Sequence, residues 1–539
     1  MRMKLIVKFS LLFLVIGFVN SASVKTKQSC ADNPMDPVCA DKRQHPRMVE
    51  DRMNPAQINV SPEQTQEYWI EIAKSFVSDQ TKRAKNTNKA KNVIFFLGDG
   101  LGITTITAAR LLLGGEEKKF SFEKFPHTGS SITYCVNEQV ADSACTSTAY
   151  LTGVKANYAT AGVNAKVPRY DCQAWQDKTH FTTSLAELAQ KMGKSTGFVT
   201  TTRVTHASPS GLYAHTADRD WEDDYEIQAD GCNPAEVDDI AKQLIHGDVG
   251  KNFNVIMGGG RRHFRGYSVY DEEGYRAKRS DERDLIQEWI DDASKPNKEY
   301  IWNKEQLMNL NVSYTDHVLG LFEGSHLLYN LQAKALGREA TEPTLEEMLY
   351  KALQIVNKND EGFFLFVEGG KIDLAHHDLE LRASLDETVE FHKAIELARN
   401  MFSEEDTLIV VTADHSHAVS MAGYPNRKHD IFGYSGNAND NKPYFTFSYA
   451  NGPGYDTHVV EGVGRVDPRT LDTSAWNFPF PAMNPRDSET HGGEDVPVYA
   501  SGPWAHLFTG TYEQNVIPHM IAYAADMTGN GWLSKSDIK

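Results

Sequence analysis

The sequence predicts a doubly wound α/β fold, in which a mostly parallel central sheet is flanked by helices. Short, continuous apolar runs recur along the chain, and runs of this length suit strands that are buried on both faces. Helical patterns lie between these runs, as expected where strands alternate with helices. Residues 418–488 depart from this pattern because they are rich in Gly, Pro and Asn, so we expect a small irregular subdomain inserted there.

Five apolar runs are expected to form strands of the sheet: residues 92–98, 197–200, 253–257, 362–367 and 407–412. Three helical stretches, at residues 182–192, 344–356 and 379–398, each precede one of these strands. A further helix over residues 64–77 is predicted outside the main body. The α/β domain as a whole is expected to span residues 61–527.

The two ends of the chain indicate an exported protein. Basic residues precede a short apolar run over residues 11–19, and small residues follow, so we assign residues 1–22 to a cleaved signal peptide. An uncleaved anchor helix is the alternative for this run. Residues 23–60 form a polar N-terminal extension. The C-terminal tail, residues 528–539, lacks the apolar stretch of a lipid-anchor signal, so we expect a secreted, soluble, extracellular form with no stable membrane anchor.

The formal net charge of −18 argues against nucleic acid and anionic membranes as partners. A phosphate ester would also be repelled at long range, so a site for one would need local cations from arginine or metal. Two acceptor triplets for N-glycosylation begin at Asn59 and Asn311, and Asn311 is the better candidate because Pro62 follows the first triplet. The six cysteines fit an oxidising compartment, and six cysteines allow 15 pairings.

Acidic and imidazole side chains gather after the predicted strands. They are Asp99 after the first run, Glu368, Asp373 and His377 after the fourth, Asp414, His415 and His417 after the fifth, and His491 later in the chain. Because ligands of open α/β sheets bind beyond the carboxyl ends of the strands, we expect these side chains to meet. Asp373 and His377 are four residues apart, so on a helix they share one face.

These residue types suit metal ions. Imidazole with carboxylate is the ligand set of zinc, and carboxylate with hydroxyl is that of magnesium. Each such residue alone is more often a helix cap or a surface histidine, and only their joint placement favours a metal centre.

Ser143 opens a predicted helix, where free N–H groups and the helix dipole favour an anion. A serine at this place could attack phosphorus, or it could simply be the N-cap of the helix. Arg219 has a guanidinium that could bind two phosphate oxygens, but a single arginine is usually part of a surface ion pair.

Six motifs, in this order, resemble those of the alkaline phosphatases. They are FLGDG at residues 96–100, DSA at 142–144, TTRVTHAS at 201–208, VEGGKID at 367–373, TADHSH at 412–417 and ETHGGED at 489–495. The resemblance covers about residues 60–527. It implies a homodimeric phosphomonoesterase of broad specificity, active at alkaline pH through a phosphoserine intermediate, with two zinc ions and one magnesium ion.

The resemblance assigns roles by position. Asp373, His377 and His491 match the ligands of the first zinc, Asp99, Asp414 and His415 those of the second, and Asp99, Ser208 and Glu368 those of magnesium. Ser143 matches the nucleophile and Arg219 the phosphate-binding arginine, while His206 and His417 match histidines just behind the ligands. A further calcium site is implied more loosely at Glu273, the backbone of Phe322, Glu323 and Glu342, where ordinary acidic surface is the alternative.

The cysteines include a departure from the family. The resemblance suggests a Cys172–Cys232 bridge, Cys30 could close a small loop with Cys39, and we pair Cys135 with Cys145. Cys145 stands two residues after the nucleophile, where many members have Gly. A free thiol there could bind zinc or oxidise, whereas a bridge to Cys135 would make it inert.

Other functions on this fold are possible. A sulfatase would need a different local motif, which is not found, and a phosphodiesterase would commonly use threonine and lack the magnesium set. A catalytically silent extracellular binding protein would need a lost ligand or nucleophile, yet every position that can be aligned is intact. Hydrolysis of an aryl phosphate separates an enzyme from a binding protein.

Overall fold

The computed structural model describes residues 61–527 together with residues 529, 532 and 538. The predicted signal peptide, the N-terminal extension, Asn59 and the pairing of Cys30 with Cys39 lie outside the described residues, as does most of the C-terminal tail. No described helix is both long enough and apolar enough to cross a membrane.

Ten strands form the central sheet, in the order β19-β2-β18-β8-β1-β7-β3-β4-β6-β5. Their bounds are β1 Asn92–Gly98, β2 His127–Ile132, β3 Ser195–Arg203, β4 Val255–Gly259, β5 Lys298–Ile301, β6 His317–Leu321, β7 Phe363–Gly369, β8 Thr407–Ala413, β18 Val496–Ser501 and β19 Gly510–Glu513. Neighbouring strands from β8 to β5 are all parallel, and β18 is antiparallel to both β8 and β2. The prediction of a mostly parallel sheet is therefore confirmed, and the five predicted strands are β1, β3, β4, β7 and β8.

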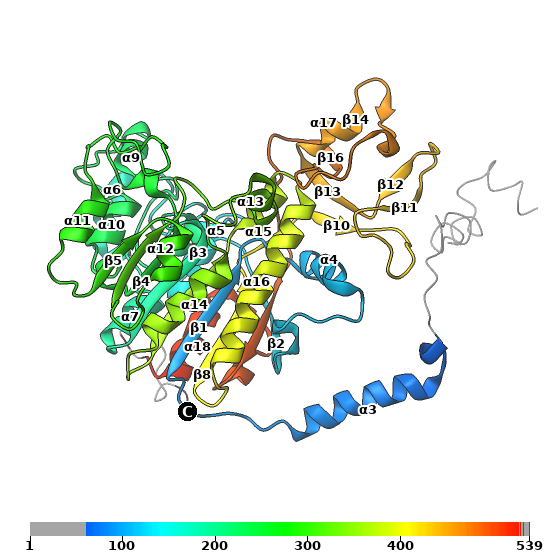
Figure 1. Cartoon of the computed structure of the whole chain (residues 1–539), viewed down its shortest axis with the longest axis horizontal. Coiled ribbons are helices and arrows are strands. Elements are labelled where there is room, and N and C mark those ends of the chain that lie inside the picture. Colours follow the sequence, from blue (N-terminus) through cyan, green and yellow to red (C-terminus); the bar gives the residue numbers. More distant parts are fainter. Residues whose placement is uncertain (1–60, 528, 530–531, 533–537, 539) are drawn as a thin grey trace, which may run out of the picture.

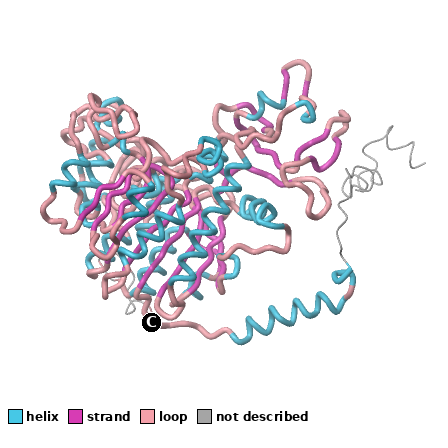
Figure 2. The backbone as a smooth tube through the Cα atoms, viewed as in Figure 1, coloured by secondary structure: helices cyan, strands magenta, loops and turns pink. Residues whose placement is uncertain are grey.

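Helices cover both faces of this sheet (Figures 1 and 2). Successive residues of a strand point to opposite faces, so Ile94 and Phe96 of β1 join one apolar cluster while Val93 and Phe95 join the other. The first cluster is completed by α4 Ile103–Gly114, α14 Leu345–Val356 and α16 Leu381–Met401. The second is completed by α5 Ser143–Thr152, α7 Leu185–Lys191, α10 Ile240–His246, α11 Leu285–Asp291 and α18 Ile517–Ala525. This two-layered core holds the carboxyl ends of the parallel strands rigidly in place.

The segment between His417 and His491 is more regular than predicted. It contains a three-stranded sheet of β10 Val419–Met421, β13 Phe447–Gly452 and β16 Ala482–Pro485, and the pairs β11 Tyr434–Asn437 with β12 Pro443–Phe445 and β14 Val459–Val460 with β15 Gly464–Arg465. A short helix, α17 Gly454–His458, lies among them. Strands this short carry little periodic pattern, which is why the sequence indicated irregular structure. In Figure 1 this subdomain projects from the body beside α16.

The chain enters and leaves the subdomain through two adjacent, paired strands. The segment leaves the body through β9 Ser416–His417 and returns through β17 His491–Gly492, and these two-residue strands pair with His417 opposite His491. The excursion therefore returns the chain to the point where it left the sheet.

The predicted peripheral helix is α3, Gln66–Lys82, which has no buried residue and extends away from the body in Figure 1. The remaining α-helices are short: α6 Cys172–Gln176, α8 Ala207–Ser210, α9 Asp224–Ala229, α12 Lys304–Asn309, α13 Asn330–Leu336 and α15 Lys371–His377. Of these, α8 and α15 lie where polar residues follow the strands.

Candidate active site and metal centre

Three adjacent strands present the acidic groups of the site. In the order β8-β1-β7, Asp414 follows β8, Asp99 follows β1, and Glu368 lies near the end of β7. All three carboxylates are fully buried. The expectation that strand ends bring these residues together is therefore met by the structure.

Ser143 is the first residue of α5, and the N-cap of this helix is Asp142. The Asp142 carboxylate accepts from the N–H groups of Ala144 and Cys145, so Ser143 is not needed as the cap. Its hydroxyl, which is 1% exposed, lies 3.3 Å from Oδ1 of Asp99 and 3.1 Å from Nε2 of His415. The serine hydroxyl therefore lies at a helix N-terminus, among the residues predicted to bind metal.

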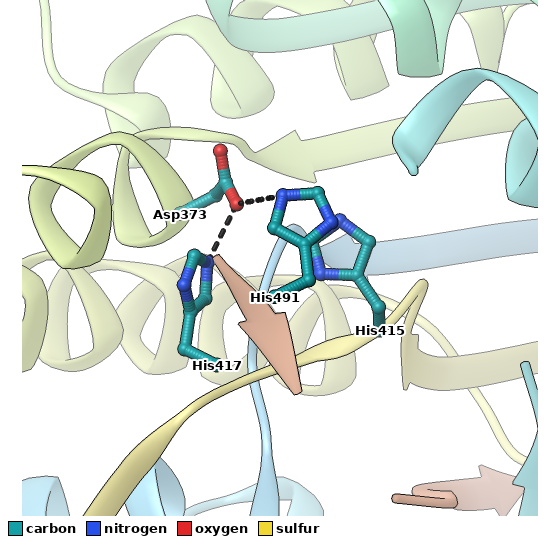
Figure 3. Close-up of side chains that lie close together, drawn as sticks. All are labelled: Asp373, His415, His417 and His491. Carbon is teal, nitrogen blue, oxygen red and sulfur yellow. Dashed lines mark hydrogen bonds and ion pairs between the residues drawn. The ribbon is translucent and has the colours of Figure 1, made fainter. Parts of the chain in front are cut away.

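The residues predicted to bind the first zinc are close together. On α15, Nε2 of His377 lies 3.4 Å from Oδ2 of Asp373. Nε2 of His491 lies 3.1 Å from Nε2 of His377 and 3.5 Å from Oδ1 of Asp373. Figure 3 shows Asp373 and His491 pointing toward one another, with His415 stacked beside His491. The ligand atoms of Asp373 and His491 also lie within 4.8 Å of those of His415 and His417, so this cluster is larger than the three predicted ligands.

The residues of the other two predicted sites also meet. Nε2 of His415 lies 3.1 Å from Oδ2 of Asp414 and 3.5 Å from Oδ1 of Asp99. On the other side of Asp99, Ser208 donates to Oδ2 at 3.4 Å. Glu368 belongs to the group that also contains Asp99 and His206, whose ligand atoms lie within 4.8 Å of one another. Asp99 thus lies between two possible cation positions.

The charge balance of this cluster fits bound metal. Oδ2 of Asp414 and Oε1 of Glu368 are buried and have no hydrogen-bond partner among the described residues. Burial, together with the carboxylates of Asp414, Asp373 and Glu368, raises the pKa of Asp99 well above its usual range. Several carboxylates buried together are costly unless cations compensate them. The donor set of imidazole, carboxylate and hydroxyl groups therefore fits zinc and magnesium.

Arg219 is held beside the serine. Its Nη1 donates to Oδ2 of Asp142 at 3.1 Å, and its Nη2 lies 3.2 Å from Nε2 of His206. Burial and the Arg219 charge lower the pKa of His206 to about 3, so this ring is neutral and its Nε2 can accept from the guanidinium. A salt bridge to a buried aspartate thus orients Arg219 toward the Ser143 region.

Glu489 is a site residue that the sequence analysis did not assign. Its carboxylate accepts from Nδ1 of His417 at 2.5 Å and from the N–H of Ala418 at 2.7 Å, and its backbone carbonyl lies 2.6 Å from Nδ1 of His377. Nε2 of His417 in turn lies 2.6 Å from Oδ1 of Asp373. The only sequence signal was its place two residues before His491.

His417 carries charge in this arrangement. Burial alone would lower its pKa, but the Asp373 and Glu489 carboxylates on either side raise the pKa to about 10. His417 thus contacts Asp373 through one ring nitrogen and Glu489 through the other, and Glu489 holds the ring in one orientation.

Two disulfides join the described cysteines. They are Cys135–Cys145 and Cys172–Cys232, and no described cysteine is free. The sulfur near Ser143 is therefore not available as a thiol ligand.

The acidic residues predicted to bind calcium lie elsewhere, around an arginine. Nη2 of Arg338 donates to Glu273 at 2.6 Å and to Glu323 at 2.7 Å, and lies 4.0 Å from Glu342. Arg261 also donates to Glu273, and Phe322 follows β6 directly before Glu323. The three glutamates converge as predicted, but two guanidinium groups already oppose their charge.

Known proteins share this fold and sequence. Residues 90–527 match the family model described as alkaline phosphatase. The membrane-bound alkaline phosphatase of Bombyx mori is 44% identical over 504 residues, covering 91% of this chain and 90% of that protein. The tissue-nonspecific isozyme of alkaline phosphatase from Rattus norvegicus is 45% identical over 484 residues, covering 86% of this chain and 89% of that protein.

Solved structures agree on the fold. The alkaline phosphatase of the Antarctic bacterium TAB5 has a TM-score of 0.55 at 21% identity, covering 82% of this chain and 100% of that one. The Thermus thermophilus alkaline phosphatase has a TM-score of 0.58 at 20% identity, covering 85% of this chain and 96% of that one. With the family model matched over most of its length and relatives more than 40% identical over nearly all of it, the chain belongs to the alkaline phosphatase family and is a phosphoric monoester hydrolase.

Proposed function

We propose that this chain hydrolyses phosphate monoesters through a covalent phosphoserine at Ser143. The observation that carries the proposal is the buried hydroxyl at the start of α5, within 3.3 Å of both Asp99 and His415. In the first step Ser143 Oγ bonds to phosphorus while the bond from phosphorus to the leaving oxygen breaks, and the serine proton passes through solvent to that oxygen, which departs as the alcohol. Water then attacks the phosphoserine and releases inorganic phosphate, which regenerates the serine.

Arg219 binds and orients the phosphoryl group in this proposal. A guanidinium offers parallel N–H donors that match two phosphate oxygens. Asp142 and His206 hold the guanidinium from behind, so little conformational entropy is lost when substrate binds. Because these groups all contact the phosphoryl group, we expect broad tolerance of the leaving group, while the net charge of −18 argues against nucleic acid as a partner.

The proposed metals are two zinc ions and one magnesium ion. Asp373, His377 and His491 would hold one zinc, Asp99, Asp414 and His415 the other, and Asp99, Ser208 and Glu368 the magnesium. When bound, these ions supply positive charge that lowers the pKa of the serine hydroxyl and of water, which gives activity at alkaline pH. We do not extend the proposal to calcium at Glu273, Glu323 and Glu342, because Arg338 already pairs with the first two of these glutamates and Arg261 with Glu273.

Aryl-phosphate hydrolysis at several pH values, with zinc and magnesium supplied, tests the proposal. We expect Ser143→Ala to lose about a thousand-fold or more in kcat and to form no phosphoserine detectable by mass spectrometry of acid-quenched protein. The matched control is Ser147→Ala in the same helix, because the Ser147 hydroxyl only donates to the Ala144 carbonyl. Absence of turnover in the metal-loaded wild-type chain would favour the alternative, a catalytically silent binding protein.

A homodimer is part of the proposal, and α3 supports it. Trp69, Ile72 and Phe76 are 53%, 49% and 59% exposed. Their spacing of three and four residues puts them on one face of the helix, where a second copy of the chain would cover them. Sedimentation of Trp69→Ser/Phe76→Ser should then show monomer, whereas Leu336→Ser, an exposed leucine on α13, should remain dimeric. A monomeric wild-type chain would contradict this.

Export is proposed from the N-terminal pattern, with N-glycosylation at the exposed Asn311. The Bombyx mori relative is named membrane-bound, so the decisive measurement is fractionation of expressing cells. Activity in the medium, with a mass decrease on glycosidase treatment that Asn311→Gln abolishes, supports a secreted glycoprotein. Activity that stays with the membranes contradicts it.

A further inference from the structure

The Cys135–Cys145 disulfide lies at the nucleophile. Cys145 is the third residue of α5, and Cys135 lies in the segment between β2 and this helix. Both residues are 2% exposed, and their Cα atoms are 5.8 Å apart. The bridge thus closes the loop of residues 136–144, and the last residues of that loop include Asp142 and Ser143. A covalent bond therefore limits where the first turn of α5 can move.

Asp142 connects this closed loop to the phosphate-binding arginine. Its carboxylate accepts hydrogen bonds from Ala144 N at 3.1 Å, Ala159 N at 2.8 Å and Arg219 Nη1 at 3.1 Å. The backbone N–H of Arg219 also donates to the carbonyl of Ala159 at 2.8 Å, and the Ala159 N–H in turn donates to Asp142. A shift of the first turn of α5 would therefore displace both the serine hydroxyl and the support of the guanidinium.

Apolar packing holds this turn only weakly. Cys135 and Cys145 pack with Ala141 and Ala156, and Ala144 packs with Ala161 and Ala207, in two small clusters that are separate from the clusters on the sheet faces. The apolar side chains of these small clusters other than the cysteines are all alanines, which bury little apolar area each. Tyr150 and Leu151 anchor the later turns of α5 in the second sheet-face cluster, so the disulfide adds its restraint at the first turn.

The second disulfide has different surroundings. Cys172 and Cys232 belong to a cluster that includes the large side chains Trp175 and Trp221. This bridge spans 60 residues of sequence, whereas Cys135–Cys145 spans 10. Closure of a longer loop restrains the unfolded chain more strongly, so the second bridge suits a role in stability.

We propose that the Cys135–Cys145 bridge positions two groups for catalysis. It holds Ser143 Oγ directly and the Arg219 guanidinium through Asp142, so that the two keep a fixed relative position. This inference rests on the proposed function of Ser143. Cleaving the bridge lowers turnover, and reforming it restores turnover. In the cleavage, a water-soluble phosphine supplies two electrons and water supplies the two protons. The products are two thiols and the phosphine oxide, whose oxygen comes from that water.

The first test compares two double variants of the metal-loaded chain. For Cys135→Ala/Cys145→Ala we expect kcat to fall about 10- to 100-fold, with weaker inhibition by inorganic phosphate, while zinc per chain stays at the wild-type value. For the matched control Cys172→Ala/Cys232→Ala we expect kcat within about twofold of wild type and the larger drop in Tm. Wild-type kcat and phosphate inhibition in the first variant would overturn the proposal.

A second measurement uses the wild-type holoenzyme, in case the variants do not fold. The chain is treated with increasing phosphine, its thiols are alkylated and mapped by mass spectrometry, and the activity of each sample is measured. Activity should fall in step with labelling of Cys135 and Cys145, and it should return when unlabelled protein is re-oxidised. Full activity in protein labelled at both positions would overturn the proposal.

Failure of this inference can be told apart from failure of the proposed function. If the wild-type chain forms no phosphoserine at Ser143, the proposed function is wrong. If it does, and the variant without the bridge forms and hydrolyses phosphoserine equally fast, only the positioning role is wrong.

Discussion

Two groups of buried acidic side chains in this molecule are balanced in different ways. At the strand ends, Asp99, Glu368 and Asp414 face imidazoles and one another, and two of their oxygens have no hydrogen-bond partner among the described residues. In the second group, Glu273 and Glu323 share the guanidinium of Arg338, and Glu273 also accepts from Arg261. Oε2 of Glu342 likewise has no hydrogen-bond partner among the described residues and lies 4.0 Å from Arg338. The first group has no guanidinium at its centre, whereas guanidinium groups enter the second.

This difference indicates which group depends on ions from solution. A guanidinium is always charged and is delivered by the chain itself, so it balances carboxylates whatever the solvent contains. Where only imidazoles and carboxylates meet, protonation or a metal must supply the balance. The two groups show that a cluster of acids does not by itself indicate a metal site, and that the neighbouring cations decide.

The largest expected effect comes from removing metal from the strand-end group. Dialysis against a strong chelator should reduce aryl-phosphate turnover to background and lower Tm, because the buried carboxylates lose their counter-charge. Adding back zinc and magnesium should restore both. Calorimetry and turnover on the same samples measure these two effects. Full activity at less than one zinc per ten chains would show that the strand-end group does not depend on metal.

A smaller effect is expected at Glu489, which orients the imidazoles of that group. Glu489→Gln keeps the shape but removes the charge that holds His417, so zinc affinity should fall about 10- to 100-fold. Competition with a zinc chelator of known affinity measures this. The matched control is Glu494→Gln, an exposed residue of the same segment, which should bind zinc like wild type. Equal affinities in both variants would show that Glu489 has no positioning role.

Removing the Arg338 guanidinium from the second group should lower stability more than activity. Arg338→Met leaves Glu323 and Glu342 without their guanidinium and Glu273 with Arg261 alone, so we expect unfolding free energy to fall by about 2–4 kcal/mol, with kcat nearly unchanged. Urea denaturation measures this. Arg283→Met, which removes a more exposed pair with Glu288, should cost less than about 1 kcal/mol. Equal losses of unfolding free energy in the two variants would show that Arg338 stabilises the protein no more than a more exposed ion pair does.

The smallest expected effect is that of calcium on the wild-type chain. Because Arg338 already pairs with Glu273 and Glu323, millimolar calcium should raise Tm by only about 1–2 °C, and the shift should be larger in Arg338→Met. Thermal unfolding of zinc- and magnesium-loaded protein with and without calcium measures both. A large rise in the Tm of wild type on adding calcium would show that the ion displaces the guanidinium and that both acidic groups depend on metal.

The central fold was largely predictable because its signals are local. Strands β1, β7 and β8 are continuous apolar runs, and α14 has both a capping box at Thr344 and an amphipathic repeat. The edge strand β19 and its neighbour β2 were missed because they are short, polar and partly exposed. The small sheets of the inserted subdomain were missed because their strands are also short.

The α/β class and the residue types of the site could be predicted from the sequence, and the family resemblance added the expected partners in each metal group. These follow from local periodicity and from motifs whose members lie within a few positions of one another. Only the tertiary structure decided that His491 meets His377 across 114 positions, that Asp142 rather than Ser143 caps α5, and that Glu489 holds two imidazoles. It also decided that Arg338 lies among the glutamates. Such contacts depend on how the chain returns to the sheet, and no local pattern records that path.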